Sequence, residues 1–265
     1  MARLHPVRQV PLIIEPDPDD PDFASVLVEA TVAGRPYRML LDTGAARSQL
    51  VADEYTLSLS AVPGNSSSAA FGGEVTEPVV TVTDLVAGPL RVPALGVTRS
   101  EGRQVNLLGM DVLGQHRCGF RLAAGVMDLE PPGGEAGNEL LIGHRGHPYV
   151  EVSWPGVSGL ACWDTGAGAT LVNRDFWLGH PGLFEPIGTS AGTDAQGERA
   201  ETPLLRVAGP VIGQRAFGSH KVVAVDLSGV NSTLDYPMDL ILGYPTIRQA
   251  DWLFDFPARR WAVTG

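Results

Sequence analysis

The acidic tripeptide Asp-Thr-Gly occurs twice in the sequence, at residues 42–44 and 164–166, each time directly after two apolar residues. Burying a carboxylate at the end of an apolar run is costly unless the group is hydrogen-bonded or shares a proton. Two carboxylates about 3 Å apart do not both ionise easily, so such a pair holds one proton and supplies both a general acid and a general base. Asp42 and Asp164 are therefore the candidate catalytic residues.

The two tripeptides belong to a longer internal repeat. The segment "LLDTGAARSQLV" at 40–51 matches "CWDTGAGATLVN" at 162–173, and "NLLGMDVL" at 106–113 matches "LILGYPTI" at 240–247. Because the blocks recur in the same order, the chain is interpreted as a duplication. The expected parts are an N-terminal extension at 1–19, a first lobe at 20–130, a linker at 131–145 and a second lobe at 146–265.

Local patterns predict a mainly β protein. The stretches around the turns at 34–36 and 88–89 each have the composition of two short strands joined by a tight connection. Helical periodicity is limited to short segments after Gly109, around residues 173–177 and after Gly243. The sequence therefore indicates two similar β lobes with a few short helices.

Composition and charge narrow the partners. The 265-residue chain is 44% hydrophobic, as in folded globular proteins, and carries a formal net charge of −11. Its single lysine, Lys221, and the lack of any basic run disfavour nucleic acid and anionic membranes as partners. No stretch approaches the roughly 20 apolar residues of a membrane span, and the apolar run at 11–14 is too short for a signal peptide.

The two cysteines bear on the compartment. Cys118 and Cys162 have no metal-ligand spacing, and two buried free thiols are favoured over a disulfide. Such thiols are typical of a reducing environment, so a cytoplasmic protein is expected.

The order of the motifs carries a family resemblance. An apolar pair, then Asp-Thr-Gly-Ala, then about sixty residues later an apolar-apolar-Gly block before a short helix, resembles the aspartic protease superfamily. The alanine after each glycine makes both halves similar to retropepsins. The resemblance covers most of both halves and implies the acid protease fold, with two retropepsin-like β-barrel lobes related by a pseudo-twofold axis.

The resemblance also implies an activity. An aspartic endopeptidase hydrolyses peptide bonds with a water activated by a dyad, here Asp42 and Asp164, and needs no cofactor and no metal. Its substrate is an extended peptide or an unfolded protein. Because both half-sites lie in one chain, a monomer is expected to be complete. The alternative is a non-catalytic peptide-binding or assembly module that retains the cleft.

The neighbours of the dyad have implied supporting roles. Thr43 and Thr165 resemble the family's threonines that hydrogen-bond between the lobes, and Gly44 and Gly166 lack side chains where backbone approaches carboxylate and substrate closely.

The residues after the glycines bear on pH dependence. Pepsin-like enzymes usually have Ser or Thr where this chain has Ala45 and Ala167, and that hydroxyl can stabilise an ionised carboxylate. Its loss on both sides predicts a less acidic pH optimum than that of pepsin.

Two polar, glycine-rich segments are candidate flaps. In the family a hairpin at this position closes over an extended peptide. The first-lobe candidates are Phe71, Gly72 and Gly73, and the second-lobe candidates are Gln196 and Gly197. Ordinary hairpin turns without substrate contact remain the alternative.

Two further pairs of residues invite simpler interpretations. Arg47 and Asp111 are expected to form an ion pair that braces the first active-site loop. His144 and His147 have a spacing seen in metal sites, but no third ligand is evident, so solvated loop histidines are expected.

Overall fold

The computed structural model describes residues 8–62, 66–68, 74–102, 105–132, 136–193 and 199–265. It is a mainly β protein with short helices, as the sequence predicts. None of the helices in these ranges is long and apolar enough to span a membrane. The helices are α1 (Glu54–Ser58), α2 (Met110–Leu113), α3 (Arg174–Gly179), α4 (Ser228–Asn231) and α5 (Tyr244–Ile247), with 3-10 turns at Leu122–Ala124 and Pro181–Leu183.

The first half of the chain contains a closed barrel. Its six strands, in order around the barrel, are β3 (Ala24–Val32), β4 (Arg35–Leu41), β11 (Asn106–Leu108), β5 (Gln49–Val51), β10 (Leu90–Ser100) and β9 (Val79–Ala87). The barrel closes because β3 pairs with both β4 and β9. Two more strands extend it, and a separate pair lies nearby: β2 (Ile13–Pro16) on β3, β6 (Ala61–Val62) on β9, and β7 (Ser66–Ser68) with β8 (Glu74–Thr76).

The hairpin of β3 and β4 illustrates how the sequence builds this barrel. Buried apolar side chains such as Val26, Val28 and Met39 point into the core. The strands are joined by Ala33 and Gly34, with φ of 49° and 77°, the left-handed conformations that a two-residue hairpin turn requires. The turn thus lies one residue earlier than expected, and Pro36 lies within β4.

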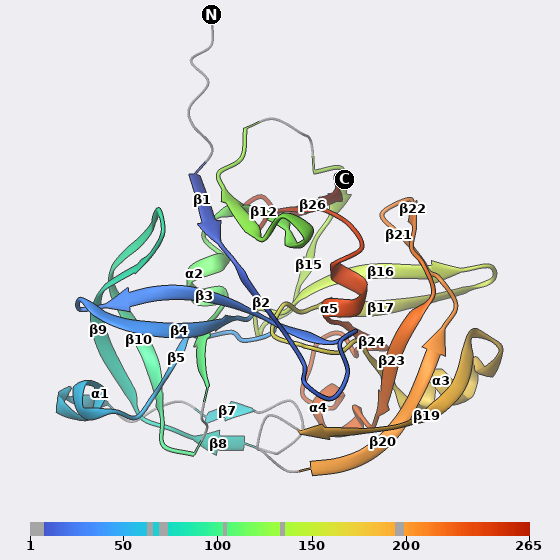
Figure 1. Cartoon of the computed structure of the whole chain (residues 1–265), viewed down its shortest axis with the longest axis horizontal. Coiled ribbons are helices and arrows are strands. Elements are labelled where there is room, and N and C mark those ends of the chain that lie inside the picture. The colour runs from blue at the N-terminus through green and yellow to red at the C-terminus, as the bar shows by residue number, and fades with distance from the viewer. Residues whose placement is uncertain (1–7, 63–65, 69–73, 103–104, 133–135, 194–198) are drawn as a thin grey trace, which may run out of the picture.

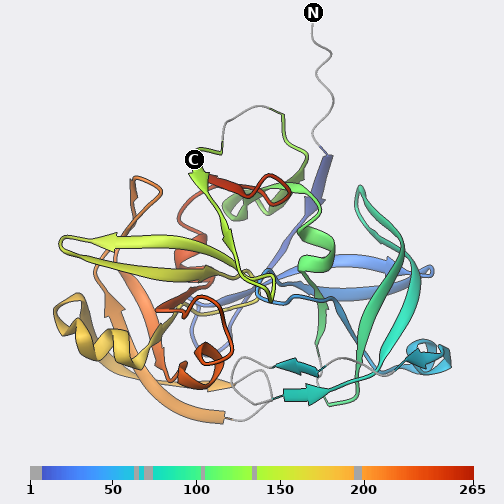
Figure 2. The ribbon, with the colours of Figure 1, turned by 180° about the vertical axis from the view of Figure 1, so that it is seen from behind.

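The second half of the chain forms one large sheet. Its strands, in order, are β19 (Phe184–Thr193), β20 (Arg199–Val207), β23 (His220–Val225), β18 (Leu171–Asn173), β24 (Leu240–Leu242), β17 (Val157–Trp163), β16 (Pro148–Trp154), β21 (Val211–Ile212) and β22 (Arg215–Ala216), with β15 (Leu141–Ile142) beside β16. Within the described residues the pairings leave this sheet open, whereas those of the first half close. Figures 1 and 2 show the blue hairpin of β3 and β4 and the yellow hairpin of β16 and β17 on opposite sides of the molecule.

The strand pairings around the two Asp-Thr-Gly segments are the same in both halves. β4 lies parallel to β11, with Leu41 beside Leu108, and β17 lies parallel to β24, with Trp163 beside Leu242. The strand after each tripeptide, β5 or β18, then pairs antiparallel with β11 or β24. Each tripeptide therefore follows the end of a strand held in the middle of its sheet.

A third sheet contains strands from both halves. It has the order β1 (Arg8–Pro11), β13 (Val126–Leu129), β12 (Arg117–Arg121), β25 (Trp252–Asp255), β26 (Arg260–Val263) and β14 (Asn138–Glu139). β12 and β25 pair antiparallel across the two halves, and Arg117 Nη1 lies 3.1 Å from Asp255 Oδ2. In Figure 1 this sheet lies at the top, between the two sides.

An aromatic cluster underlies the third sheet. The ring of Trp163 lies 4.7 Å from that of Phe120 and 4.4 Å from that of Phe254, measured between centroids. Trp163 is fully buried, which confirms its expected role in core packing. Since Trp163 directly precedes Asp164, the cluster holds the second tripeptide against both halves.

The N-terminal segment contacts the second half as well. The ammonium of Lys221 lies 2.8 Å from Asp20 Oδ2 and 3.0 Å from Asp22 Oδ2. Ala24 N donates to Gly168 O at 3.3 Å, within the loop that follows the second tripeptide. The start of the first barrel is therefore fastened to the second half of the chain.

Candidate active site

The two Asp-Thr-Gly loops meet between the halves of the molecule. Asp42 N donates to Leu108 O and Asp164 N donates to Leu242 O, both at 3.0 Å, so each loop leaves its sheet in the same way. The Asp42 and Asp164 carboxyl groups are hydrogen-bonded to each other. The structure thus brings together two carboxyls that lie 122 positions apart in the sequence.

Both carboxyls favour the protonated form. Burial raises the pKa of Asp42 well above its usual range, and the adjacent Asp164 carboxylate raises it further. The pKa of Asp164 is also raised by burial, but N–H groups of its own loop and of the opposite loop oppose the shift. A pair of this kind retains one proton at pH values where an ordinary aspartate has lost it.

The hydrogen bonds divide the two roles unequally. Asp164 Oδ1 accepts from Gly166 N at 2.8 Å and from Gly44 N at 3.2 Å. Hydrogen bonds from backbone N–H groups stabilise the ionised form of a carboxylate. The arrangement therefore favours an ionised Asp164 and a protonated Asp42 that donates to it.

Glycine is required at the third position of each loop. A Cβ on Gly44 would lie 2.4 Å from Asp164 Oδ2, and a Cβ on Gly166 would lie 2.5 Å from Asp42 Cγ. Both distances are far below van der Waals contact. Any side chain at either position would push the two carboxyls apart.

The two threonines cross between the loops. Thr43 Oγ1 donates to Trp163 O at 2.9 Å, and Thr165 Oγ1 donates to Leu41 O at 2.6 Å. Each hydroxyl also accepts from the opposite threonine's backbone N–H, at 3.1 Å and 3.0 Å. These four buried bonds fix the separation of the two loops, and with it the separation of the carboxyls.

A further hydroxyl supports each loop six positions after its aspartate. In the first half, Ser48 Oγ donates to Asp111 Oδ1 at 2.7 Å and accepts from Gly109 N at 3.0 Å. In the second half, Thr170 Oγ1 accepts from Gly243 N at 3.2 Å. The sequence analysis did not identify this pair, although the aligned repeat "DTGAARS" and "DTGAGAT" carries the signal.

The expected partner of Asp111 is wrong. Ser48 supplies two hydrogen bonds to the Asp111 carboxylate, from its N–H at 2.9 Å and from its hydroxyl. Among the ion pairs of the described residues, none joins Arg47 to Asp111, and Arg47 is exposed. Asp111 braces the loop through a neutral hydroxyl because that group lies under the loop, whereas Arg47 faces solvent.

The expectation of two solvated histidines is correct for His144 only. His144 is exposed, and its Nδ1 lies 2.9 Å from Asp235 Oδ2. His147 is largely enclosed, and its ring hydrogen-bonds to the backbone of Gly44. Burial lowers the pKa of this imidazole, so the neutral ring packs against the first loop. A contact between the linker and the loop left no signal in the sequence.

The candidate flap residues lie outside the described residues. Phe71, Gly72 and Gly73 fall between β7 and β8, which pair antiparallel, and Gln196 and Gly197 fall between β19 and β20, which also pair antiparallel. Both segments therefore connect the strands of hairpins. Their contact with substrate stays a prediction.

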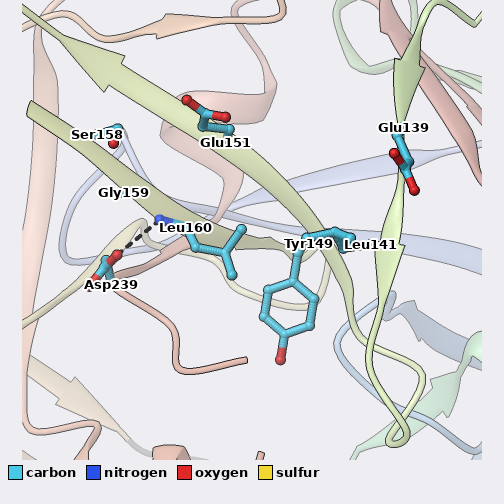
Figure 3. A pocket seen from close by; sticks show the side chains of 8 residues that line it. All are labelled: Glu139, Leu141, Tyr149, Glu151, Ser158, Gly159, Leu160 and Asp239. Carbon is cyan, nitrogen blue, oxygen red and sulfur yellow. Dashed lines mark hydrogen bonds between the residues drawn. The ribbon is translucent and has the colours of Figure 1, made fainter. Parts of the chain in front are cut away.

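A separate pocket lies on the second half, away from the two aspartates. It has a volume of about 490 Å³ and is lined by Tyr149 and Leu160 together with the carboxylates Glu151 and Asp239. Figure 3 shows Asp239 directed at Leu160 N, to which it is hydrogen-bonded at 2.9 Å. Asp239 thus has a structural partner, and the pocket contains neither Asp42 nor Asp164.

The cysteines and metal-ligating side chains complete the description of the site. Cys118 and Cys162 are buried free thiols, as expected. Burial raises the pKa of the Cys162 thiol, and the nearby dyad raises it further, so this thiol stays protonated. Within the described part of the chain, no group of three or more His, Cys, Asp or Glu side chains is placed to hold a metal ion.

Comparison with known proteins gives one match. Residues 28–115 match a family model described as "gag-polyprotein putative aspartyl protease". The match covers the first barrel, including the first Asp-Thr-Gly segment and Asp111. No curated protein matches the chain. Residues 28–115 are therefore similar to the retropepsin-like aspartyl proteases, whose family name indicates a hydrolase.

Proposed function

We propose that the protein is an aspartic endopeptidase in which Asp42 and Asp164 form a single catalytic dyad. The observation that carries the proposal is the hydrogen bond between the two carboxyls, held by equivalent loops from the two halves of one chain. The match of residues 28–115 to aspartyl proteases supports the same conclusion for the first half. In this account the second half supplies the second lobe of the fold, related to the first by a pseudo-twofold axis.

The unequal hydrogen bonding suggests how the labour is divided. The ionised Asp164 takes a proton from a water molecule held between the carboxyls, and that water attacks the carbonyl carbon of the scissile peptide bond. The protonated Asp42 donates its proton to the carbonyl oxygen, which gives a neutral tetrahedral diol. Transfer of a proton to the peptide nitrogen then breaks the carbon–nitrogen bond and releases an acid and an amine. No covalent bond to the protein forms.

The surroundings support a preference for extended substrates. The candidate flap hairpins and the ends of the central strands offer backbone groups that an extended peptide can pair with. We therefore propose an extended peptide or an unfolded protein as substrate and a monomer as the active form. Since Ala45 and Ala167 provide no hydroxyl to stabilise the ionised dyad, the proposed pH optimum is less acidic than that of pepsin. A cytoplasmic location remains part of the proposal.

The test is cleavage of an unfolded protein between pH 3 and 7, a range chosen around the carboxylate titration. Asp42→Asn and Asp164→Asn each keep the shape of the side chain and remove the acid or the base. We expect each to lower kcat by at least about 100-fold, the usual scale of general acid–base catalysis. Asp226→Asn, at an exposed position, is the matched control and should cleave normally.

Two results would contradict the proposal. One is cleavage by both dyad variants at the wild-type rate. The other is a folded wild-type chain that binds the unfolded protein without cutting it, which would favour the alternative of a peptide-binding module.

A further inference from the structure

A chain of hydrogen bonds connects a buried histidine to the second catalytic loop. His220 Nε2 lies 2.7 Å from Thr246 Oγ1, and Thr246 Oγ1 lies 2.7 Å from Thr170 Oγ1. Thr170 Oγ1 in turn accepts from Gly243 N at 3.2 Å. Thr170 and Thr246 are fully buried, so no solvent competes for these contacts.

The direction of the chain follows from its outer end. His220 Nδ1 lies 2.8 Å from Gly218 O, and a carbonyl oxygen only accepts, so Nδ1 carries the proton. The amide of Gln249 lies farther from Nδ1, at 3.2 Å, and bonds to Pro245 O at 2.9 Å. In the neutral ring Nε2 is then the acceptor. Thr246 donates to Nε2, Thr170 donates to Thr246, and Gly243 N donates to Thr170.

The inner end of the chain touches the loop that bears Asp164. A Cβ on Gly243 would lie 2.2 Å from Ala169 O, so this glycine packs directly against the loop. The residues on either side of Gly243 bond to the same loop: Asp164 N donates to Leu242 O at 3.0 Å, and Tyr244 N donates to Ala167 O at 2.9 Å. A change in the position of Gly243 would therefore move Asp164.

The first half has no such chain because a carboxylate performs the same task there. Asp111 accepts from the Ser48 hydroxyl directly. The residue aligned with Asp111 in the repeat is Pro245, which has no side-chain acceptor. The second half thus needs another acceptor for Thr170, and the Thr246 hydroxyl fills this place only if its own proton is directed elsewhere.

We propose that His220 is a positioning residue of the active site. In its neutral form it accepts from Thr246, which orients Thr170 and holds Gly243 and the Asp164 loop in place. The proposal rests on the proposed function, since it concerns the dyad of that reaction. It also assigns the two half-sites different supports, a carboxylate in the first half and an imidazole in the second.

The surroundings of His220 favour the neutral ring. Its strand neighbour on β20 is the apolar Val207. The nearby cation is Arg248, at the end of α5, while the next residue, Lys221, directs its ammonium to Asp20 and Asp22. Burial lowers the pKa of the imidazole, and the Arg248 charge lowers it further. Protonation at acidic pH would place a proton on Nε2 and force the Thr246 hydroxyl to turn.

The first test follows the loop by NMR and does not depend on turnover. In the wild type, the amide resonances of Gly243 and Gly166 should shift with pH in step with the His220 ring. His220→Gln keeps an acceptor near the Nε2 position but does not titrate, so that component of the shift should disappear. His116→Gln, a partly exposed histidine 3.1 Å from Glu130, is the matched control and should leave the shifts as in the wild type. If His220→Gln leaves the pH dependence of both amides unchanged, the proposal is wrong.

The second test is the pH profile of cleavage. Thr246→Val removes one hydroxyl of nearly the same shape and should lower kcat about tenfold while KM changes less than about twofold, the effect of losing one buried hydrogen bond. His220→Gln should keep kcat within about threefold of the wild type and extend activity to lower pH. Equal loss of activity in His220→Gln and His220→Ala would contradict the acceptor role. If the wild type fails to cleave, the proposed function is wrong, whereas the NMR test still decides the position of the loop.

Discussion

Replacing Thr43 by valine tests how the two halves are held together at the dyad. The change keeps the branched shape and removes the hydroxyl. It breaks two bonds between the loops, Thr43 Oγ1 to Trp163 O at 2.9 Å and Thr165 N to Thr43 Oγ1 at 3.0 Å. Since the site is fully buried, no water replaces the lost partners.

The expected cost follows from the two groups left unpaired. A buried donor or acceptor without a partner costs about 1–3 kcal/mol, so the free energy of unfolding should fall by roughly 2–6 kcal/mol. This is a large part of the total stability of about 5–15 kcal/mol that is common for proteins. No cavity term is added because valine fills the same space. Cleavage should also decline, because the separation of the carboxyls is no longer fixed.

Urea denaturation measures this effect. The midpoint should fall for Thr43→Val while the slope stays unchanged, since the surface exposed on unfolding is the same. Thr98→Val is the matched control, because Thr98 is also buried and its hydroxyl takes part in none of the described hydrogen bonds. Its free energy of unfolding should stay within about 1 kcal/mol of the wild type. If Thr43→Val is as stable as Thr98→Val, the crossing bonds do not hold the loops as argued here.

Three further predictions concern stability. Asp42→Asn should be more stable than the wild type near pH 7: the pKa of Asp42 is raised in the folded state, so the wild type loses stability as pH rises from 3.8 through the folded value, and thermal melts across this range should show the difference. Asp111→Ala should lose about 2 kcal/mol in urea denaturation because it leaves Ser48 without its acceptor, whereas Arg47→Ala should stay within about 0.5 kcal/mol; equal losses would restore the ion pair. The pKa of His220 is lowered on folding, so the wild type should lose stability as pH falls below 6.5 towards the folded value, and His220→Gln should show a flatter pH dependence in melting temperature.

The repeat made the central part of the fold predictable. Apolar runs ending in Asp-Thr-Gly, followed by an apolar-apolar-Gly block, specify a buried strand, a tight loop and a short helix from local residues alone. The structure has these elements at β4 and α2 and again at β17 and α5. The closed six-stranded barrel at residues 24–108 matches the expected architecture of the first half.

The third sheet could not be predicted because it depends on pairing between distant segments. Strand β12 pairs with β25, and the residues joined lie more than 130 positions apart, so no local pattern indicates the partner. The N-terminal strand β1 extends the same sheet through its contact with β13.

The supporting side chains of the site were missed for a similar reason. His147 and His220 lie in a linker and on an ordinary strand, and only the tertiary fold brings them to the catalytic loops. Ser48 and Thr170 were different, since the repeat itself aligns them. Arg47 illustrates the opposite error, because its spacing favoured an ion pair while its side chain faces solvent.

The shared proton of Asp42 and Asp164 is tested most directly by NMR titration of their carboxyl carbons in the wild type, with Asp42→Asn and Asp164→Asn to assign the signals. We expect both carboxyls to respond to the same protonation step, at a pH above the usual value of 3.8. In each variant, the remaining carboxyl should titrate in a single step without the influence of a second charge. Two independent titrations near pH 3.8 in the wild type would show that the aspartates do not act as one dyad.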